Sequence, residues 1–98
     1  MNKFNPSKFD ELVLSRTRLG ILALLIGGDK LDFTYIRKAL KLSDGNLSVQ
    51  IRKLEEAELI KVKKIFIERK PKTFCTITPK GRKAIKGLVA ELESILKK

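Results

Sequence analysis

The stretch that decides the fold is Leu40–Phe74, LKLSDGNLSVQIRKLEEAELIKVKKIFIERKPKTF. Its first half predicts an amphipathic helix from Asp44 to about Glu58, with Ser43 as the N-cap because a serine hydroxyl accepts a hydrogen bond from the first turn. The apolar residues that share one helix face, at i, i+4 and i+7, are Leu47, Ile51 and Leu54. Such a helix packs its apolar face on a core and leaves its polar face to solvent or to a partner.

The second half of the stretch predicts a β-hairpin. The runs Leu59–Ile67 and Thr73–Thr78 are rich in β-formers, and Glu68–Lys72 contains a proline and polar residues that suit a loop. Basic residues dominate this hairpin, and the only acid among them is Glu68. The basic residues are Lys61, Lys63, Lys64, Arg69, Lys70 and Lys72. Burial does not require this charge, so the hairpin indicates an anionic partner; the alternative is a charged edge that discourages aggregation.

The N-terminal side of this stretch predicts three more helices and a short strand. The helices cover Pro6 to Val13, Arg16 to Ile26 and Tyr35 to Lys41, and the strand covers Lys30 to Phe33. Thr34 is expected to cap the helix that follows it. The second helix is apolar almost throughout, so we expect it at the centre of the core. The residues expected to face inward around the third helix are Phe33, Ile36, Ala39 and Leu40.

On the C-terminal side, Thr78 and Pro79 form a cap and first-turn pair that opens a long helix to about Leu96. This helix has an a/d apolar pattern and is longer than a core of this size needs. We therefore expect residues 1–14 and 79–98 to form a symmetric homodimer; the alternative is that they close the monomer's own core. The residues expected at the dimer interface are Phe4, Phe9, Leu12, Ile85, Leu88, Val89, Leu92, Ile95 and Leu96.

The order of these elements predicts an α+β fold, mainly α: a winged helix-turn-helix with a two- or three-stranded antiparallel wing and a long C-terminal helix. With 98 residues and no repeat or linker, residues 1–98 are expected to form one domain. The stretches RLGILALL, LSDGNLSVQIRKLEEAELI and TFCTITPKGRKAI resemble the small MarR/ArsR-like winged-helix transcriptional regulators, over about Arg16 to Lys86. The resemblance implies that the hairpin is a wing, which lies along the phosphate backbone or in the minor groove of DNA. Such regulators usually carry glycine where this chain has Glu58.

The composition favours an anionic partner and argues against an enzyme. The chain has 22 Lys and Arg against 11 Asp and Glu, a formal charge of +11, which indicates nucleic acid or a membrane surface. Histidine is absent, so the most frequent general base and the commonest metal ligand are missing, and we predict no cofactor and no metal.

Cys75 is expected to be a small buried hydrophobe, with redox sensing as the alternative. No apolar run is long enough to cross a bilayer and no secretory signal is present, so we predict a cytoplasmic protein without a membrane partner.

The polar face of the fourth predicted helix suits a reader of the DNA major groove. Asn46 and Gln50 can pair with adenine, Arg52 can pair with guanine, and Val49 can meet a thymine methyl group. The residues of this helix predicted to contact DNA are Ser43, Gly45, Asn46, Ser48, Val49, Gln50, Arg52 and Lys53. The alternatives are that Asn46 only helps to cap the helix and that Arg52 pairs with a neighbouring glutamate.

The basic residues of the wing suit phosphate contacts, which position a protein on DNA without reading its sequence. The wing residues predicted to bind DNA are Lys63, Lys64, Arg69, Lys70 and Lys72. Further candidates for phosphate contact are Arg16, Arg18, Arg37 and Lys38, although one of these arginines could brace the core instead.

Together these features predict a sequence-specific, double-stranded DNA-binding transcriptional regulator that acts as a homodimer on a pseudo-palindromic operator. The alternatives are a winged-helix module for protein–protein interaction and an architectural DNA-binding protein without sequence preference. A small-molecule effector is not identifiable from the sequence.

Overall fold

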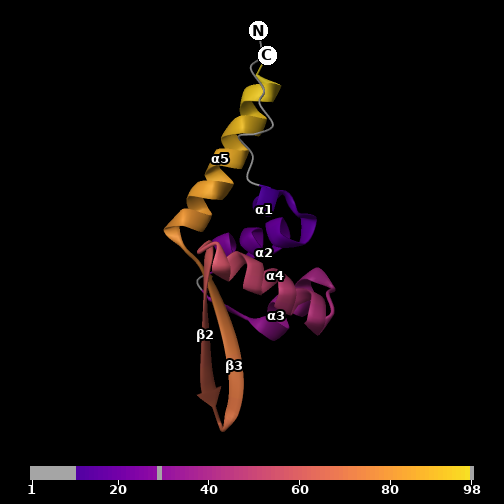
Figure 1. Ribbon diagram of the computed structural model, residues 1–98, viewed down its shortest axis with the longest axis vertical. Helices are drawn as coiled ribbons and strands as arrows, with labels where there is room; N and C mark the ends of the chain where they lie inside the picture. The colour runs from indigo at the N-terminus through magenta and orange to yellow at the C-terminus, as the bar shows by residue number, and fades with distance from the viewer. Residues whose placement is uncertain (1–10, 29, 98) are drawn as a thin grey trace.

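The molecule consists of a helical body, a hairpin that extends from one side of it and a long helix that extends from the other side (Figure 1). The structure, a computed structural model, describes residues 11–28 and 30–97. Its helices and strands are α1 (Glu11–Leu14), α2 (Arg16–Gly27), β1 (Leu31–Asp32), α3 (Phe33–Leu40), α4 (Asp44–Glu56), β2 (Ile60–Ile67), β3 (Lys70–Ile77) and α5 (Pro79–Leu96). This arrangement confirms the predicted winged helix-turn-helix with a three-stranded antiparallel sheet and a long C-terminal helix.

Helix α2 lies at the centre of the helical body. Its residues Ile21, Leu22 and Leu25 are completely buried, as expected for the helix with the most continuous apolar sequence. The apolar face of α4 joins the same core, where Leu47 and Leu54 are also completely buried. Full burial of such a side chain stabilises the fold by about 1.5–3 kcal/mol. The contact with α2 therefore fixes the orientation of α4 and leaves its opposite face outward.

Helix α3 begins two residues earlier than predicted. The Asp32 carboxylate caps it by accepting a hydrogen bond from the Tyr35 N–H at 2.7 Å, and Thr34, the predicted cap, lies inside the first turn. Aspartate accepts this bond at least as well as threonine, and its charge also favours the positive end of the helix dipole. The prediction for Ala39 is wrong as well, because Ala39 is exposed and the completely buried residue of this helix is Ile36.

The turn from α3 to α4 depends on a non-glycine residue in the left-handed region. Lys41 has a φ of 56°, and the Leu42 N–H reaches back to the Arg37 carbonyl at 3.0 Å. Ser43 then caps α4, and Arg37 Nε lies 3.0 Å from the carboxylate of Asp44. Main-chain hydrogen bonds, a cap and an ion pair thus hold α4 against α3.

The sheet has the strand order β1-β3-β2 and is antiparallel throughout. The predicted loop Glu68–Lys72 is wrong, because β3 begins three residues earlier than predicted and only Glu68 and Arg69 form the turn. Their φ angles of 51° and 67° are both positive, as a two-residue type I′ hairpin turn requires. Pro71 pairs with Phe66 next to the turn. The alternation of the antiparallel ladder leaves the nitrogen of this proline outside the hydrogen bonds, so proline is tolerated in the strand.

The corner after α4 contains the glutamate that departs from the family pattern. Helix α4 ends at Glu56, two residues before its predicted end, and Glu58 has a φ of 62°. The Glu58 N–H donates to the Glu55 carbonyl and the Leu59 N–H to the Leu54 carbonyl, the paired hydrogen bonds of a Schellman motif. This position therefore requires the left-handed conformation that glycine adopts without a steric cost, and Glu58 occupies it with strain.

The first turn of α5 explains the glycine in the sequence TPKG. The Gly81 N–H donates to the Thr78 hydroxyl at 3.0 Å, and this hydroxyl donates to the Glu58 carbonyl at 2.7 Å. A Cβ at Gly81 would overlap the Leu59 carbonyl oxygen and would lie 2.8 Å from Cγ1 of Ile77. The absence of a side chain at this position lets α5 start directly against the corner that follows α4.

Helix α5 packs on the core only through its first half. Ile85 and Leu88 contact the core, and beyond them the helix leaves the helical body (Figure 1). The large apolar residues exposed along α5 are Val89, Leu92 and Leu96, with Leu96 83% exposed. These three side chains lie outside the core that residues 11–28 and 30–97 form.

The helix predicted from Pro6 lies within the described residues only as α1. Phe4 and Phe9, which were predicted for the dimer interface, lie outside the described residues. Leu12 is half-buried and packs against the core, whereas Leu14 is 47% exposed.

Candidate nucleic-acid interface

The outward face of α4 gathers most of the residues predicted to contact DNA. The exposed members of the predicted set are Ser43, Gly45, Asn46, Ser48, Val49, Arg52 and Lys53. Val49 is 44% exposed and is the large apolar side chain exposed on this helix. A Cβ at Gly45 would meet no atom within 4 Å, so internal packing does not require glycine there. The space in front of the helix start is therefore open to a partner.

A chain of hydrogen bonds runs from the corner between α1 and α2 to this face of α4. Arg18 Nε donates to the Leu12 carbonyl at 2.7 Å, and a terminal guanidinium nitrogen of Arg18 donates to the Gln50 side-chain oxygen at 2.6 Å. The Gln50 amide in turn donates to Oδ1 of Asn46 at 3.1 Å. Arg18 is thus an arginine that braces the fold, as one of the open alternatives expected. Gln50, which is half-buried, orients Asn46.

The basic residues of the wing divide between the two faces of the sheet. Residues paired directly across two strands share a face, and Val62, which is paired with Cys75, lies on the face that packs on the core. Side chains alternate along a strand, so Lys64 lies on the same side as Val62. The lysines on the opposite, outer face are Lys61, Lys63, Lys70 and Lys72. The structure therefore brings the predicted wing residues to one hairpin but not to one surface.

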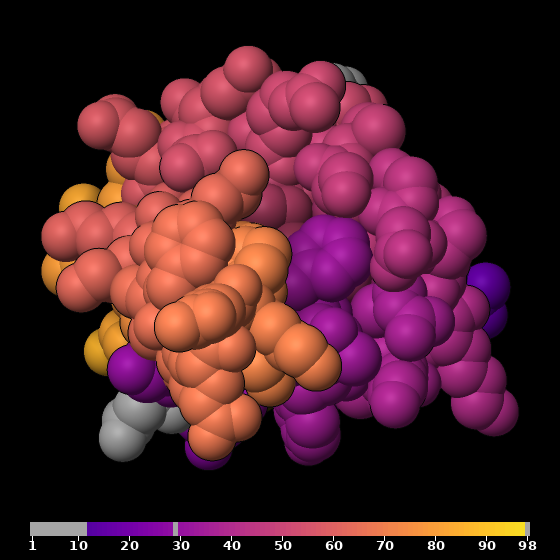
Figure 2. All heavy atoms as spheres, turned by 90° about the horizontal axis from the view of Figure 1, so that it is seen from below, coloured from indigo at the N-terminus to yellow at the C-terminus, as the bar shows by residue number. Residues whose placement is uncertain are grey.

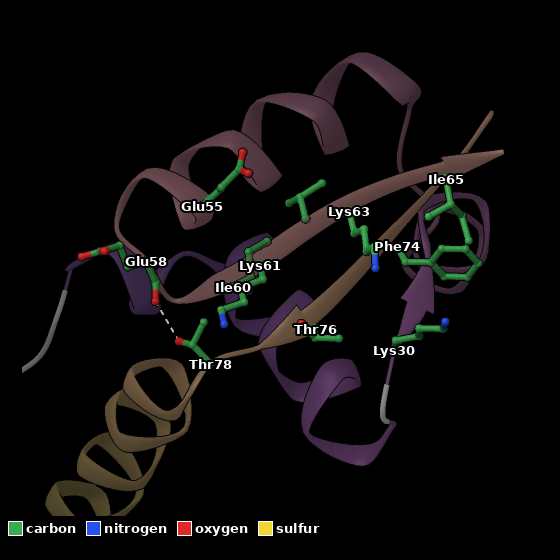
Figure 3. A pocket seen from close by; sticks show the side chains of 11 residues that line it. Lys30, Glu55, Glu58, Ile60, Lys61, Lys63, Ile65, Phe74, Thr76 and Thr78 are labelled. Carbon is green, nitrogen blue, oxygen red and sulfur yellow. Dashed lines mark hydrogen bonds between the residues drawn. The ribbon is translucent and has the colours of Figure 1, made fainter.

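The outer face of the sheet is hollowed at the root of the wing, with a volume of about 590 Å³ (Figure 3). Phe74 and Ile65, together with Ile60 and Val62, form its apolar part. Lys30 Nζ lies 4.8 Å from the centroid of the Phe74 ring, a cation–π distance. Glu55 and Glu58 line the side next to α4 (Figure 3). Lys30, Lys61 and Lys63 line the hollow as well, so its lining carries charges of both signs.

The distal half of the wing also carries apolar side chains whose exposure the sequence analysis missed. Phe66 is 76% exposed and Ile67 is 42% exposed. In the sequence, Ile65–Ile67 looks like part of an ordinary β-strand. Its position next to the turn is the signal that could have revealed the exposure of Phe66 and Ile67. Figure 2 shows the face of the molecule on which the end of the hairpin lies together with α3 and α4.

An apolar groove of about 410 Å³ lies between the end of α2 and α5. Ile26, Ile85 and Val89 contribute to its lining, and Ile26 and Val89 are among the exposed large apolar residues. Val89 thus belongs both to the groove and to the exposed apolar residues of α5, which also include Leu92 and Leu96.

Cys75 lies in the core as a free thiol. Burial, and to a smaller extent the nearby Glu55 carboxylate, raises the pKa of the Cys75 thiol from 9.0 to about 11. A completely buried, protonated thiol packs as a small hydrophobe. Within residues 11–28 and 30–97, no three His, Cys, Asp or Glu residues are grouped so that they could hold a metal ion. In the same part of the chain, no helix combines the length and the apolar character needed to span a membrane.

Comparison with known proteins identifies relatives over nearly the whole chain. Residues 17–96 match the family described as winged helix DNA-binding domain. The uncharacterized protein MJ0432 of Methanocaldococcus jannaschii is 41% identical over 83 residues, which cover 85% of this chain and 90% of that protein. The structure of a transcriptional regulator homologue from Pyrococcus horikoshii OT3 is similar with a TM-score of 0.79 and 34% identity, covering 89% of this chain and 86% of that chain.

A further structure shares the fold at lower sequence identity. MepR of S. aureus, which was crystallised in complex with DNA, is similar with a TM-score of 0.77 and 19% identity, covering 93% of this chain and 74% of that chain.

Proposed function

Because the chain belongs to the family of winged helix DNA-binding domains, we propose that it is a transcriptional regulator that binds double-stranded DNA with sequence preference as a homodimer. The observation that carries the proposal is the exposed polar face of α4, which lies opposite a completely buried apolar face and on the same side of the molecule as a basic hairpin (Figure 2). In the proposed complex α4 lies in the major groove and the wing lies on the backbone and minor groove next to it.

Three side chains of α4 supply the chemistry of base recognition. Asn46 pairs with adenine, Arg52 pairs with guanine and Val49 meets a thymine methyl group. The start of α4 favours a phosphate because its main-chain N–H groups carry a partial positive charge. Asp44 at this position would oppose an anion, but its carboxylate is paired with Arg37 at 3.0 Å.

The wing adds affinity without sequence information. In the proposed complex, Lys64, Arg69, Lys70 and Lys72 contact phosphates, because they surround the distal half of the hairpin and all four are exposed. Lys63 makes the weaker contribution, since it lies beside the hollow that Glu55 and Glu58 also line.

The homodimer forms through α5 together with the N-terminal residues. The exposed apolar residues Val89, Leu92 and Leu96, the half-buried Ile95 and the groove beside Ile26 form a surface that a second copy would bury. A two-fold axis along this surface would place the two α4 helices about one helical turn of DNA apart, on a pseudo-palindromic operator. Residues 1–14 and 79–98 would supply the interface.

The proposed mode of action is occupancy of the operator in the cytoplasm, which controls access of RNA polymerase. The two alternatives have different signatures. A protein-interaction module would expose a broader apolar surface on α4, where Val49 is the large apolar residue that is exposed. An architectural protein would bind all duplexes with similar affinity.

Selection of bound duplexes from a random pool, followed by a salt titration on the enriched sequence, tests the proposal. We expect a pseudo-palindrome to be enriched. If each dimer neutralises about six to ten phosphates, its affinity should fall by roughly 10³–10⁵ between 50 and 200 mM salt. A pool without any consensus would refute sequence preference, and an affinity independent of salt would refute the phosphate contacts.

Substitutions test the separate roles of the helix and the wing. The double substitution Lys70→Ala and Lys72→Ala should weaken binding to every duplex. It should also lower the salt slope, the steepness with which the logarithm of the binding constant falls with the logarithm of the salt concentration, by about 0.9 for each lost phosphate contact. Asn46→Ala should instead reduce the preference for the selected duplex over a mixed-sequence duplex and leave the salt slope unchanged. Lys83→Ala, which removes an exposed lysine from α5, is the matched control. Identical behaviour of the helix and wing variants would contradict the division of roles.

A further inference from the structure

An aromatic side chain stands near the end of the wing with most of its surface in water. Phe66 is 76% exposed and is paired directly across the hairpin with Pro71, which is also exposed. Because residues paired in this way share a face, the phenylalanine ring and the proline ring form one small apolar surface next to the turn. Ile67 adds a partly exposed apolar side chain on the opposite face.

Neither the monomer nor the proposed dimer covers this surface. Along the same face of β2, Ile60 is buried and Val62 packs against the core, whereas Lys64 and Phe66 farther out are exposed. The hairpin extends past the helical body, and α5 extends from the opposite side (Figure 1). The apolar surface at Phe66 is therefore available to a partner while α5 is engaged in a dimer.

The charges around Phe66 indicate what this partner is. Lys64 lies on the same face, Arg69 lies in the turn, and Lys70 and Lys72 lie on the outer face of the same short hairpin. A wing of a second copy would bring the same four cations against this surface, so like charges oppose a contact between two wing ends. An exposed aromatic ring on a hairpin that carries cations on both faces and in its turn suits nucleic acid, because phosphates bind the cations and bases offer flat surfaces for stacking.

We propose that Phe66, with Pro71 behind it, enters the minor groove beside the α4 contact and inserts between two base pairs, so that the protein kinks its operator. The inference rests on the proposed function, in which the wing contacts DNA. Phenylalanine and proline are among the side chains that act as wedges in the minor groove, where they partly unstack a base step and bend the duplex toward the major groove. The two-residue turn and the paired strands fix the backbone that carries the ring, so insertion requires little ordering of the hairpin.

Bending and unstacking can be measured separately from affinity. The probes are duplexes selected by the wild-type protein, with dyes at both ends to report bending by energy transfer and 2-aminopurine beside successive base steps to report unstacking. The wild-type protein should bring the ends closer together and raise the aminopurine fluorescence at one step. Phe66→Ala should lose both signals and bind about ten- to a hundredfold more weakly. Phe66→Leu keeps an apolar side chain and should retain most of the bend.

Two controls separate the wedge from other roles of the hairpin. Ile67→Ala removes an apolar side chain at the neighbouring position but from the opposite face, and it should bend DNA as the wild type does. Because Phe66 is exposed, the Phe66→Ala variant should have the same urea midpoint of unfolding as the wild-type protein. Bending and unstacking by Phe66→Ala at the wild-type level would overturn the inference, and so would a loss of affinity with the bend retained.

The remaining outcomes distinguish failure of the wedge from failure of the proposed function. If the wild-type protein selects a consensus and Phe66→Ala bends it equally well, only the wedge is refuted. If the wild-type protein binds no duplex, both proposals fail. Phosphatidylglycerol vesicles provide the third arm: binding to vesicles that is lost in Phe66→Ala, with DNA binding unchanged, would assign the surface to a membrane and overturn the inference.

Discussion

Replacing Arg18 with alanine should weaken both the fold and the base preference while leaving phosphate contacts intact. Arg18 makes two hydrogen bonds, to the Leu12 carbonyl at 2.7 Å and to Gln50 at 2.6 Å. Hydrogen bonds that involve a charged group contribute about 1.5–3 kcal/mol each, and Arg18 is only half-buried, so water replaces part of what is lost. We expect the free energy of unfolding to fall by about 2–3 kcal/mol.

Arg18→Ala should reduce the base preference because Arg18 holds Gln50, and Gln50 holds Asn46. Without Arg18, the Gln50 side chain loses the partner that holds its oxygen, and its hydrogen bond to Asn46 at 3.1 Å is no longer fixed. A neutral hydrogen bond of this kind contributes about 0.5–1.5 kcal/mol, so discrimination for the base that Asn46 reads should fall by up to about tenfold. The salt slope should stay the same, because in this interpretation Arg18 contacts the protein and not a phosphate.

Urea unfolding measures the loss of stability, and titration of two duplexes that differ at one adenine measures the loss of preference. Arg16→Ala is the matched control for the urea measurement, since Arg16 is an exposed arginine on the same helix. Arg18→Lys keeps the charge but lacks the planar fork that reaches two acceptors, so it should resemble Arg18→Ala. The reasoning is refuted if Arg18→Ala unfolds like Arg16→Ala. It is equally refuted if Arg18→Ala weakens binding to both duplexes alike and lowers the salt slope, because Arg18 would then be a phosphate contact.

Three further predictions concern stability and reactivity. Glu58→Gly should raise the free energy of unfolding by about 0.5–1 kcal/mol in urea, because glycine removes the left-handed strain at some entropic cost; a lower stability would contradict this reading of the corner. Gly81→Ala should lower the free energy of unfolding by at least about 1–3 kcal/mol, because the added Cβ would overlap the Leu59 carbonyl oxygen. Gly87→Ala, where a Cβ meets no atom within 4 Å, should raise it by about 0.5–1 kcal/mol, and equal effects of the two alanines would refute the packing argument. At about pH 8 the Cys75 thiol should react with a disulfide reagent at least about a hundredfold more slowly than in the unfolded chain, because its pKa is raised from 9.0 to about 11 and its side chain is completely buried. Equal rates at pH 8 would contradict the burial of the thiol.

The helices were predictable because their apolar spacing and caps are local properties of the sequence. The observed ends of α2, α4 and α5 lie within two residues of the expected ones. The hairpin turn was mispredicted because Glu68 and Arg69 adopt positive φ without the glycine or asparagine that normally signals it. The cap of α3 was misplaced because Asp32 and Thr34 are both acceptable caps, and packing rather than sequence decides between them.

The polar face of α4 was predictable from rotation about the helix axis once its buried residues were known. The hydrogen bond from Arg18 to Gln50 was not, because it joins residues 32 positions apart and no spacing rule connects them. The exposure of Phe66 was also hidden, since it depends on how far the hairpin extends past the helical body. Long-range contacts and the reach of an element are properties of the packed molecule.

Methylation protection on a selected duplex tests most directly whether α4 occupies the major groove while the wing occupies the minor groove. Dimethyl sulfate methylates guanine at N7, which faces the major groove, and adenine at N3, which faces the minor groove. We expect two patches of protected guanine N7 about 10 base pairs apart, each flanked by protected adenine N3. Unprotected guanine N7 in a saturated complex, or protection of adenine N3 alone, would contradict the proposed placement of α4.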